Sequence, residues 1–232
     1  MRFPRMLPQH LPLGPIARAA LDCFVVNGYH GTTTRQIAMA AGLSVPGVYH
    51  HFASKHAILV AICEVAMREL ISASERAIAD AGEDVLDRFD ALVECLVQFH
   101  ADFSDVAFVS FTEIRSLQGE ARKQHLAHRR REQQLITDLV EEGVAAGVFG
   151  TDDPRHVARA ISSICLGISQ WYRVGRDLPL EELAETHVRI CRDTTKWVGD
   201  HKASSYLRTL RPRPLDGDDG NGSLAPGAST LD

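Results

Sequence analysis

The residues of this 232-residue chain that could carry chemistry are concentrated in one string, GYHGTTTRQIAMAAGLSVPGVYHHFASK, at positions 28 to 55. Three consecutive threonines are followed by Arg35, and the string ends in a tyrosine, two histidines and Lys55. Hydroxyl, imidazole and cationic side chains of this kind bind phosphates and base edges. The composition of this string therefore indicates nucleic-acid recognition.

Two short helices joined by a glycine-containing turn are needed to position these side chains. We expect them at about 34–41 and 45–51, after a supporting helix that begins at Pro15 and ends at Gly28. Ser44 is the expected N-cap of the last helix, and Pro46 is tolerated in its first turn. This arrangement is a helix-turn-helix, whose second helix enters the major groove.

The second helix is expected to turn one apolar face, Val45, Val48 and Phe52, towards the protein and the opposite face towards DNA. The threonines lie at a helix N-terminus, where the helix dipole favours a phosphate. The expected DNA-binding residues are Thr33, Thr34, Arg35, Ser44, Pro46, Gly47, Tyr49, His50 and Lys55. Arg2 and Arg5 are candidates for the minor groove.

Three other interpretations of this string remain open. Tyr49 and Phe52 could be core aromatics, and the threonines could simply cap a helix. His50 and His51 could suggest a metal, but adjacent residues do not share a helix face and no third ligand is near in the sequence. We therefore expect no metal and no cofactor.

The string closely resembles the DNA-binding domain of the tetracycline-repressor (TetR) family. The resemblance covers Ile16 to Leu59, and its matching elements are Gly28-Tyr29, Thr32-Thr33-Thr34, Ile37-Ala38, Ala40-Ala41-Gly42, Tyr49-His50-His51-Phe52 and Ser54-Lys55. It implies a one-component repressor that binds a palindromic operator as a homodimer and is released by a small molecule. Pro46 and Gly47 depart from a polar reading face and leave Tyr49 and His50 to make its polar contacts, so further specificity is expected from Arg35, Thr34, the arm or DNA shape.

Charge is distributed unevenly between the two parts of the chain. Residues 1–60 hold five Arg and Lys against Asp22 alone, a net charge of +4, so the remainder of a chain of net charge −5 carries −9. A positive head on an acidic body suits a DNA-binding module, although chance could produce the same imbalance. The five cysteines include no C-x-x-C pair, which argues against a disulfide framework or zinc ribbon.

The rest of the sequence predicts an all-α protein. Ala, Leu, Glu and Arg are plentiful, and apolar residues recur at helical spacing. Further helices are expected at about 54–79, 85–103, 106–117, 120–146, 154–175 and 179–199. The expected domains are a flexible arm (1–13), a helix-turn-helix domain (14–60), an effector-binding and dimerisation domain (61–200) and a mostly disordered tail (201–232). No apolar run reaches the roughly 18 residues of a membrane span, and we expect a cytoplasmic protein.

The last two predicted helices are the natural dimer interface, because each has an apolar stripe and the first also has a face of small residues. The expected interface residues are Val157, Ile161, Ile164, Ile168, Leu183, Val188 and Cys191. The family resemblance implies a four-helix interface from this pair. A monomeric bundle is the alternative.

The effector site is expected among aromatic and arginine side chains of the body. The candidates are Phe99, Phe103, Phe108, Phe111, Arg115, Arg122, Arg130 and Trp171. The arginine-rich stretch 115–131 could be a solvated helix face, or an anion site at the mouth of an apolar pocket. Together with a similarity to family members that govern fatty-acid or steroid breakdown, the second interpretation makes an acyl-CoA thioester the first expected effector and a drug-like or aromatic molecule the second.

Catalytic motifs are absent from the sequence: it contains no G-x-S-x-G, H-E-x-x-H, G-x-G-x-x-G or Walker A string. The tail string from Asp216 to Gly220 fails as a calcium loop because its fifth position is glycine and its twelfth is Gly227. We therefore expect no enzyme. An architectural DNA-binding protein without an effector and a helical enzyme are the alternatives.

Overall fold

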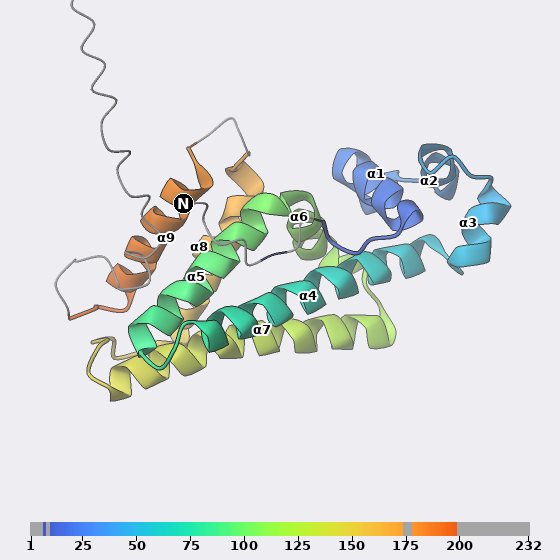
Figure 1. The fold of residues 1–232 in the computed structure, drawn as a ribbon. Coiled ribbons are helices and arrows are strands. Elements are labelled where there is room, and N and C mark those ends of the chain that lie inside the picture. The colour runs from blue at the N-terminus through green and yellow to red at the C-terminus, as the bar shows by residue number, and fades with distance from the viewer. Residues whose placement is uncertain (1–6, 8–9, 174–177, 199–232) are drawn as a thin grey trace, which may run out of the picture.

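The computed structural model describes residues 7, 10–173 and 178–198, and in these residues the chain is built from helices, as expected (Figure 1). The helices are α1 (Pro15–Gly31), α2 (Thr34–Ala40), α3 (Val45–His51), α4 (Lys55–Asp80), α5 (Val85–Asp102), α6 (Ser104–Thr112), the 3-10 helix η1 (Glu113–Ser116), α7 (Gly119–Ala145), α8 (Pro154–Trp171) and α9 (Leu180–Thr194).

Helices α1 to α3 form a small head at one end of the molecule, and α4 runs from this head into the body (Figure 1). The head packs around Phe24, Ile37 and Val48, each at most 2% exposed. Helix α1 bends at Gly28, whose φ of 69° suits glycine, and continues for one more turn. The predicted helix end at Gly28 therefore appears as a kink.

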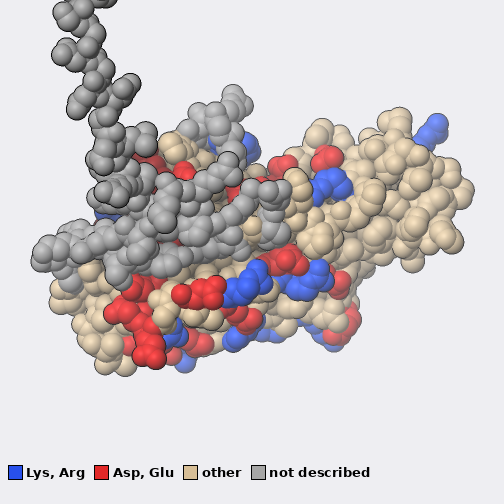
Figure 2. Space-filling view, viewed as in Figure 1, with Lys and Arg blue, Asp and Glu red and all other residues tan. Residues whose placement is uncertain are grey.

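The body is a bundle of α4 to α9 in which α5 is the central helix. Nearly every side chain of α5 from Phe89 to Ala101 is buried, because α4, α7, α8 and α9 all pack on it. A central helix is therefore apolar on most of its circumference. Figure 2 shows acidic and basic side chains mixed over the visible face of the body, whereas the visible face of the head is mostly uncharged.

Part of the N-terminal arm is packed against the protein. Leu7 and Leu11 are 4% and 3% exposed, and Arg18 Nη2 donates to the Leu11 carbonyl at 3.4 Å. Burial of the two leucines offsets the loss of conformational entropy when these positions become ordered. The sequence-based prediction of a flexible arm did not anticipate this packing. Arg2, Arg5 and the predicted tail at 201–232 lie outside the described residues.

The predicted dimer residues need a correction. Ile161, Ile168, Leu183, Val188 and Cys191 are at most 1% exposed within their own subunit, where they form the contacts of α8 and α9 with the rest of the bundle. A side chain already covered by its own chain has little surface to offer a partner. Of the predicted set, Val157 and Ile164 are the two that are half-buried.

Candidate DNA-binding surface and effector cavity

Two N-caps set the geometry of the helix-turn-helix. Thr33 Oγ1 accepts from the Gln36 backbone N–H at 3.2 Å, and Gln36 Oε1 accepts from the Thr33 N–H at 2.7 Å, which is a complete capping box. Ser44 Oγ accepts from the Gly47 N–H at 3.2 Å and begins α3. The turn between the two helices passes through Gly42 at φ 67°. Thr33 and Ser44 therefore cap helices in the free protein.

The face of α3 that was predicted to meet DNA is solvent-exposed. Tyr49 is 50% exposed, and Pro46 and His50 are exposed beside it. The Tyr49 hydroxyl lies 3.5 Å from Thr34 Oγ1 of α2, which brings the two helices' polar groups to one surface. Arg35 is exposed on α2, whereas Gly47 is half-buried. Phe52 is half-buried and packs against the core.

Lys55 has a local partner set that the sequence did not reveal. Its Nζ donates to the carbonyls of Tyr29 and Thr32, both at 2.6 Å, and lies 4.3 Å from the centroid of the Tyr29 ring. Burial lowers the pKa of this amine, and the nearby Glu113 carboxylate opposes that shift. Lys55 thus ties the start of α4 to the turn between α1 and α2, and one of its three N–H donors is left for another acceptor.

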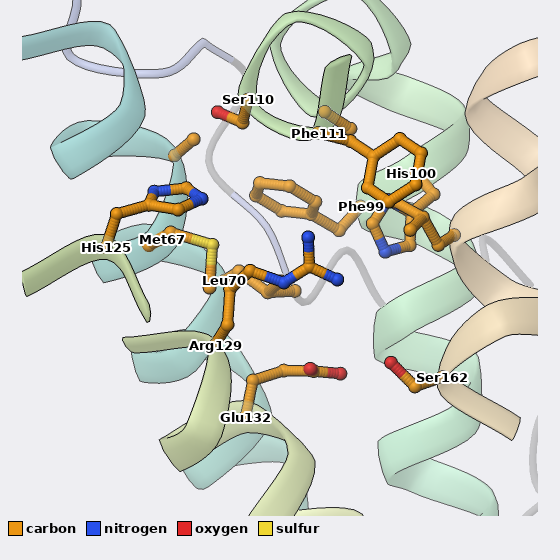
Figure 3. A pocket seen from close by; sticks show the side chains of 13 residues that line it. Met67, Leu70, Phe99, His100, Ser110, Phe111, His125, Arg129, Glu132 and Ser162 are labelled. Carbon is orange, nitrogen blue, oxygen red and sulfur yellow. The ribbon is translucent and has the colours of Figure 1, made fainter. Parts of the chain in front are cut away.

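A cavity of about 40 Å³ lies in the body, where α4, α5, α6, α7 and α8 meet (Figure 3). Its wall combines apolar and polar side chains: Ala66, Met67, Leu70, Phe99, His100, Ala107, Ser110, Phe111, His125, Arg129, Glu132, Ser162 and Leu166. Phe99 and Phe111 belong to the predicted effector set. The cavity of about 40 Å³ has room for about three or four water molecules, since one water needs roughly 10–15 Å³ by this measure.

The polar side of this cavity comes mainly from α5 and α7. Figure 3 shows the Arg129 guanidinium reaching into its centre, with His100 and His125 on either side and Glu132 pointing towards Ser162. Burial, with Arg129 nearby, lowers the pKa of both His100 and His125 to about 4. Burial raises the pKa of Glu132 to about 7. Both imidazoles are therefore neutral at physiological pH.

Hydrogen bonds connect η1, which directly follows the cavity helix α6, to α1 of the head. Two residues after Phe111, the Glu113 carboxylate accepts from the Tyr29 backbone N–H at 3.3 Å and from Ser116 Oγ at 2.9 Å. Ser116 Oγ also lies 3.2 Å from His30 Nε2. Tyr29 therefore bonds to both groups: its backbone N–H donates to Glu113, and its carbonyl accepts from Lys55 Nζ. A displacement of α6 would therefore strain the hydrogen bonds to Tyr29 and His30, which lie just before the helix-turn-helix.

Comparison with known proteins agrees with this architecture in both parts of the chain. Residues 16–62 match the family model described as bacterial regulatory proteins, tetR family, and residues 82–195 match the tetracyclin repressor-like C-terminal domain. The chain belongs to the TetR family. Both the all-helical fold and the family membership that the sequence predicted are therefore confirmed.

Curated TetR-family relatives are transcription regulators. The HTH-type transcriptional repressor KstR2 of Mycobacterium tuberculosis H37Rv is 27% identical over 183 residues, which cover 76% of this chain and 89% of the relative. KstR2 of Rhodococcus jostii RHA1 is 29% identical, over 75% of this chain and 86% of the relative. The chain is thus a TetR-family regulator with repressors among its relatives, and this family is one of regulators rather than enzymes.

Solved TetR-family structures share the fold over most of the chain. A tetR-family regulatory protein from Rhodococcus RHA1 superimposes with a TM-score of 0.73 at 29% identity, covering 80% of this chain and 97% of its own. AibR in complex with isovaleryl coenzyme A and operator DNA gives a TM-score of 0.65 at 22% identity, covering 75% and 97%. At that identity the likeness to AibR concerns the fold alone.

Six predicted effector residues of this TetR-family chain lie outside the cavity wall. Arg115, Arg122 and Arg130 are exposed, and Phe108 is 36% exposed on α6. Phe103 packs on the Phe99 ring at 5.4 Å, behind the cavity, and Trp171 stacks on His187 at 6.3 Å. At these three arginines the structure agrees with a solvated face. Residue type and helical spacing alone did not distinguish residues that line the cavity from residues on the protein surface.

Sequence reasoning missed the residues that make the cavity polar. His100, His125 and Glu132 are buried, and Arg129 is half-buried beside the exposed Arg130. A usable pattern was present, since residues 125, 129 and 132 recur at helical spacing and share a face of one helix. Their polar character hid that periodicity, which is normally sought among apolar residues.

Neither a metal cluster nor a membrane helix is found among the described residues. Within them, His, Cys, Asp and Glu side chains nowhere gather in threes as a metal would need. The helices of this part of the chain also lack the combination of length and apolar character that would carry them across a lipid bilayer.

Proposed function

We propose that this TetR-family chain is a ligand-responsive repressor that binds a palindromic operator as a homodimer and releases it when an effector enters the α4–α8 cavity. The observation that carries the proposal is the continuity of α6 and η1. Ser110 and Phe111 line the cavity, and Glu113 and Ser116 bond to Tyr29 and His30 of the head. We expect such a regulator to act in the cytoplasm.

Effector entry has to move part of the cavity wall. A space of about 40 Å³ is far smaller than the roughly 300–1,000 Å³ of an ordinary ligand pocket. Phe111 is 38% exposed on α6 and is the most exposed residue of the cavity wall. Its displacement would strain the hydrogen bonds of Glu113, so the ligand would favour a conformation that fits the operator less well.

The DNA-contacting residues are proposed as predicted from the sequence. Tyr49, His50 and Arg35 would reach bases, while Thr33, Thr34, Ser44 and Lys55 would face phosphates and Pro46 and Gly47 would let the helix approach closely. The head, at 14–60, and the effector and dimerisation domain, at 61–200, are proposed as the functional units. The exposed polar groups on α3 are few, so specificity also depends on DNA shape.

The dimer interface is proposed on the outward faces of α8 and α9. Ala160, Ser163 and Gly167 form a strip of small residues on α8, and a Cβ added at Gly167 would meet nothing within 4 Å. Trp171 and Ile190 are 50% and 39% exposed. Small residues allow two helices to approach closely, and exposed large apolar side chains are costly unless a partner covers them.

The first candidate effector is an acyl-CoA thioester. Support comes from the fold shared with AibR, whose complex holds isovaleryl coenzyme A, and from the exposed cations Arg122, Lys123 and Arg130 on α7. An aromatic or drug-like molecule is the second candidate, because Phe99 and Phe111 lie on the wall. An architectural DNA-binding protein would bind DNA without responding to either.

A fluorescence-anisotropy titration tests the proposal. The protein is titrated against DNA from upstream of its own gene and against random DNA of equal length, and octanoyl-CoA is then added. Selective binding that the thioester reverses is the expected result. A panel of other acyl-CoA thioesters and aromatic molecules is tested in the same way. If the protein binds its DNA selectively but none of these ligands reverses the binding, ligand-responsive repression is contradicted and an architectural role is favoured.

A further inference from the structure

Arg129 is a cation that forms no ion pair within 4.0 Å in the described part of the chain, and Glu132 is the carboxylate of the cavity wall whose charge it influences. Its guanidinium lies 5.4 Å from the centroid of the Phe111 ring and extends into the cavity (Figure 3). In the part of the chain that the structure describes, no hydrogen bond or ion pair is made by this side chain, although Arg131, two residues on, pairs with Glu75 at 2.8 Å. A half-buried guanidinium in this position lacks the acceptors that its five N–H groups can bind.

Two further wall residues present buried polar atoms that have no hydrogen-bond partner. They are Nδ1 of His100 and both ring nitrogens of His125. These side chains are 6% and 4% exposed, so bulk water does not satisfy them. Leaving a buried polar group unpaired is unfavourable. These unpaired nitrogens of α5 and α7 around one cavity therefore suit a ligand that brings a polar group to its centre.

We propose that the part of the effector that enters this cavity is a carboxylate, held by Arg129 together with N–H groups of His100 and His125. The apolar body that carries the carboxylate packs on Phe99, Phe111 and Leu70. This inference rests on the proposed function, because it names the chemical class of the molecule that acts at the same site.

Charge decides between an anion and a cation. Arg129 is the one wall residue that is charged throughout the physiological range, so an amine would meet a like charge. The two imidazoles are neutral, and each keeps one N–H to donate to an acceptor. The planar guanidinium fork fits a carboxylate with two parallel hydrogen bonds. Burial raises the pKa of Glu132 to about 7, against opposing effects of the Arg129 charge and a hydrogen bond with Ser162, so the proton that Glu132 keeps at neutral pH weakens its attraction for Arg129.

The small volume of the cavity indicates that the carboxylate is the end of the ligand that enters it first. The cavity of about 40 Å³ admits one small polar group, whereas an apolar body must displace Phe111 at the opening. If the effector is a thioester, its acyl group then ends in a second, free carboxylate and the coenzyme stays outside. If it is a free acid, the same carboxylate enters first.

Paired probes test the carboxylate directly. Butanoate, octanoate, dodecanoate and phenylpropanoate are each compared with their primary amides by isothermal titration calorimetry on the full chain. We expect at least one acid to bind about tenfold or more tighter than its amide, as one charge-assisted bidentate contact allows. In Arg129→Gln the acid should bind no better than the amide, and Arg129→Lys should recover part of the difference.

Arg68→Gln is the matched control, because Arg68 lies on α4, another helix of the cavity, but is exposed outside the cavity wall and pairs with Glu69. It should leave the preference for the acid unchanged. Equal affinity of every acid and its amide, or an acid preference that survives Arg129→Gln, would overturn the proposal.

Operator release is measured in parallel to separate this inference from the proposed function. If an acid binds through Arg129 but leaves DNA binding unchanged, ligand-responsive repression fails while the carboxylate site stands. If a molecule releases the operator equally well from wild type and Arg129→Gln, the repression mechanism stands and the carboxylate inference fails.

Discussion

At the scale of single residues, the body contains a buried charge cluster that is separate from the effector cavity. Asp90 of α5 and Arg192 of α9 form an ion pair with side chains 0% and 6% exposed, and one of its bonds, from Arg192 Nε to Asp90 Oδ1, is 2.8 Å long. Glu94 lies one turn further along α5, and neither of its carboxylate oxygens has a hydrogen-bond partner. Burial and the charge of Asp90 raise the pKa of Glu94 to about 8, against a weaker opposing effect of Arg192.

This shift makes stability depend on pH. The unfolded carboxyl loses its proton near its ordinary pKa of 4.5, while the folded one keeps it until about 8. Unfolding is therefore increasingly favoured as the pH rises from about 4.5 to 8, and the effect is complete above 8. We expect Glu94→Gln, which resembles the protonated form, to raise the Tm relative to wild type at pH 8 and not at pH 5.

The size of this effect is on the order of 4 kcal/mol at pH 8, since the rise in pKa from 4.5 to about 8 corresponds to about 1.4 kcal/mol for each pKa unit. Thermal unfolding of the two proteins across this pH range measures it. A constant difference in Tm between variant and wild type would show that Glu94 ionises normally.

His50 is the residue whose loss should reduce sequence selectivity. It is exposed on α3, and a good contact to a base edge is worth about 1–3 kcal/mol of discrimination. His50→Ala should therefore weaken operator binding far more than binding to random DNA. Anisotropy titrations against both DNAs measure the ratio, and equal losses on the two would remove His50 from the base-contacting set.

Lys55→Ala provides the contrast. A residue that neutralises a phosphate weakens binding to all sequences alike and reduces the dependence of affinity on salt. Because Lys55 also holds the carbonyls of Tyr29 and Thr32, the variant should in addition lower the Tm slightly. A salt dependence equal to that of wild type would limit Lys55 to this local role.

At the scale of helices, the sequence predicted where a helix lies in the chain better than which other helices pack against it. Capping and proline patterns located α3 at Val45–His51 to the residue, because a cap, a first-turn proline and a terminal aromatic all act within one short segment. They could not show that α6 begins at Ser104 or that a 3-10 turn follows it. Those details depend on α1, α4 and α8, which contact α6 but are distant from it in sequence.

The same limit explains the errors in the candidate site. Helical periodicity shows that Ile161 and Ile168 share a buried face but not whether their own chain or a partner covers it. It likewise could not show that Arg129 points inwards while Arg122 and Arg130 point outwards, since all three have identical side chains. Tertiary packing decides both questions.

A substitution at Gly143 tests how tightly α7 packs against Phe149. A Cβ at this position would overlap the ring of Phe149, which itself packs edge-to-face on Phe89 at 5.0 Å. Alanine favours a helix by about 1 kcal/mol over glycine, but overpacking a core costs about 1–3 kcal/mol. We expect Gly143→Ala to lower the free energy of unfolding in chemical denaturation. A gain in stability would show that Phe149 moves away at little cost.

At the scale of the whole molecule, operator binding depends on a second subunit. One recognition helix offers few polar contacts, and a palindromic operator requires a two-fold protein. We expect Gly167→Arg, which places a long charged side chain on the small-residue strip of α8, to shift the protein from dimer to monomer and to weaken operator binding. Sedimentation velocity measures the first effect.

Gln124→Arg, at an exposed position of α7, is the matched control and should remain dimeric. A dimer that persists in Gly167→Arg would place the interface elsewhere on the molecule.

The account as a whole requires the cavity and the head to be coupled through Glu113. The most direct measurement is operator affinity with and without octanoate, in wild type and in Glu113→Ala, with ligand binding followed in the same samples. Glu120→Ala is the control, because Glu120 is exposed and forms only a surface pair with Lys123. In wild type and control, the ligand should weaken operator binding at least about fivefold, the lower end of ordinary allosteric coupling. In Glu113→Ala, ligand and DNA should each still bind, but the ligand should leave operator affinity nearly unchanged. Release of the operator from Glu113→Ala to the same extent as from wild type would contradict the account.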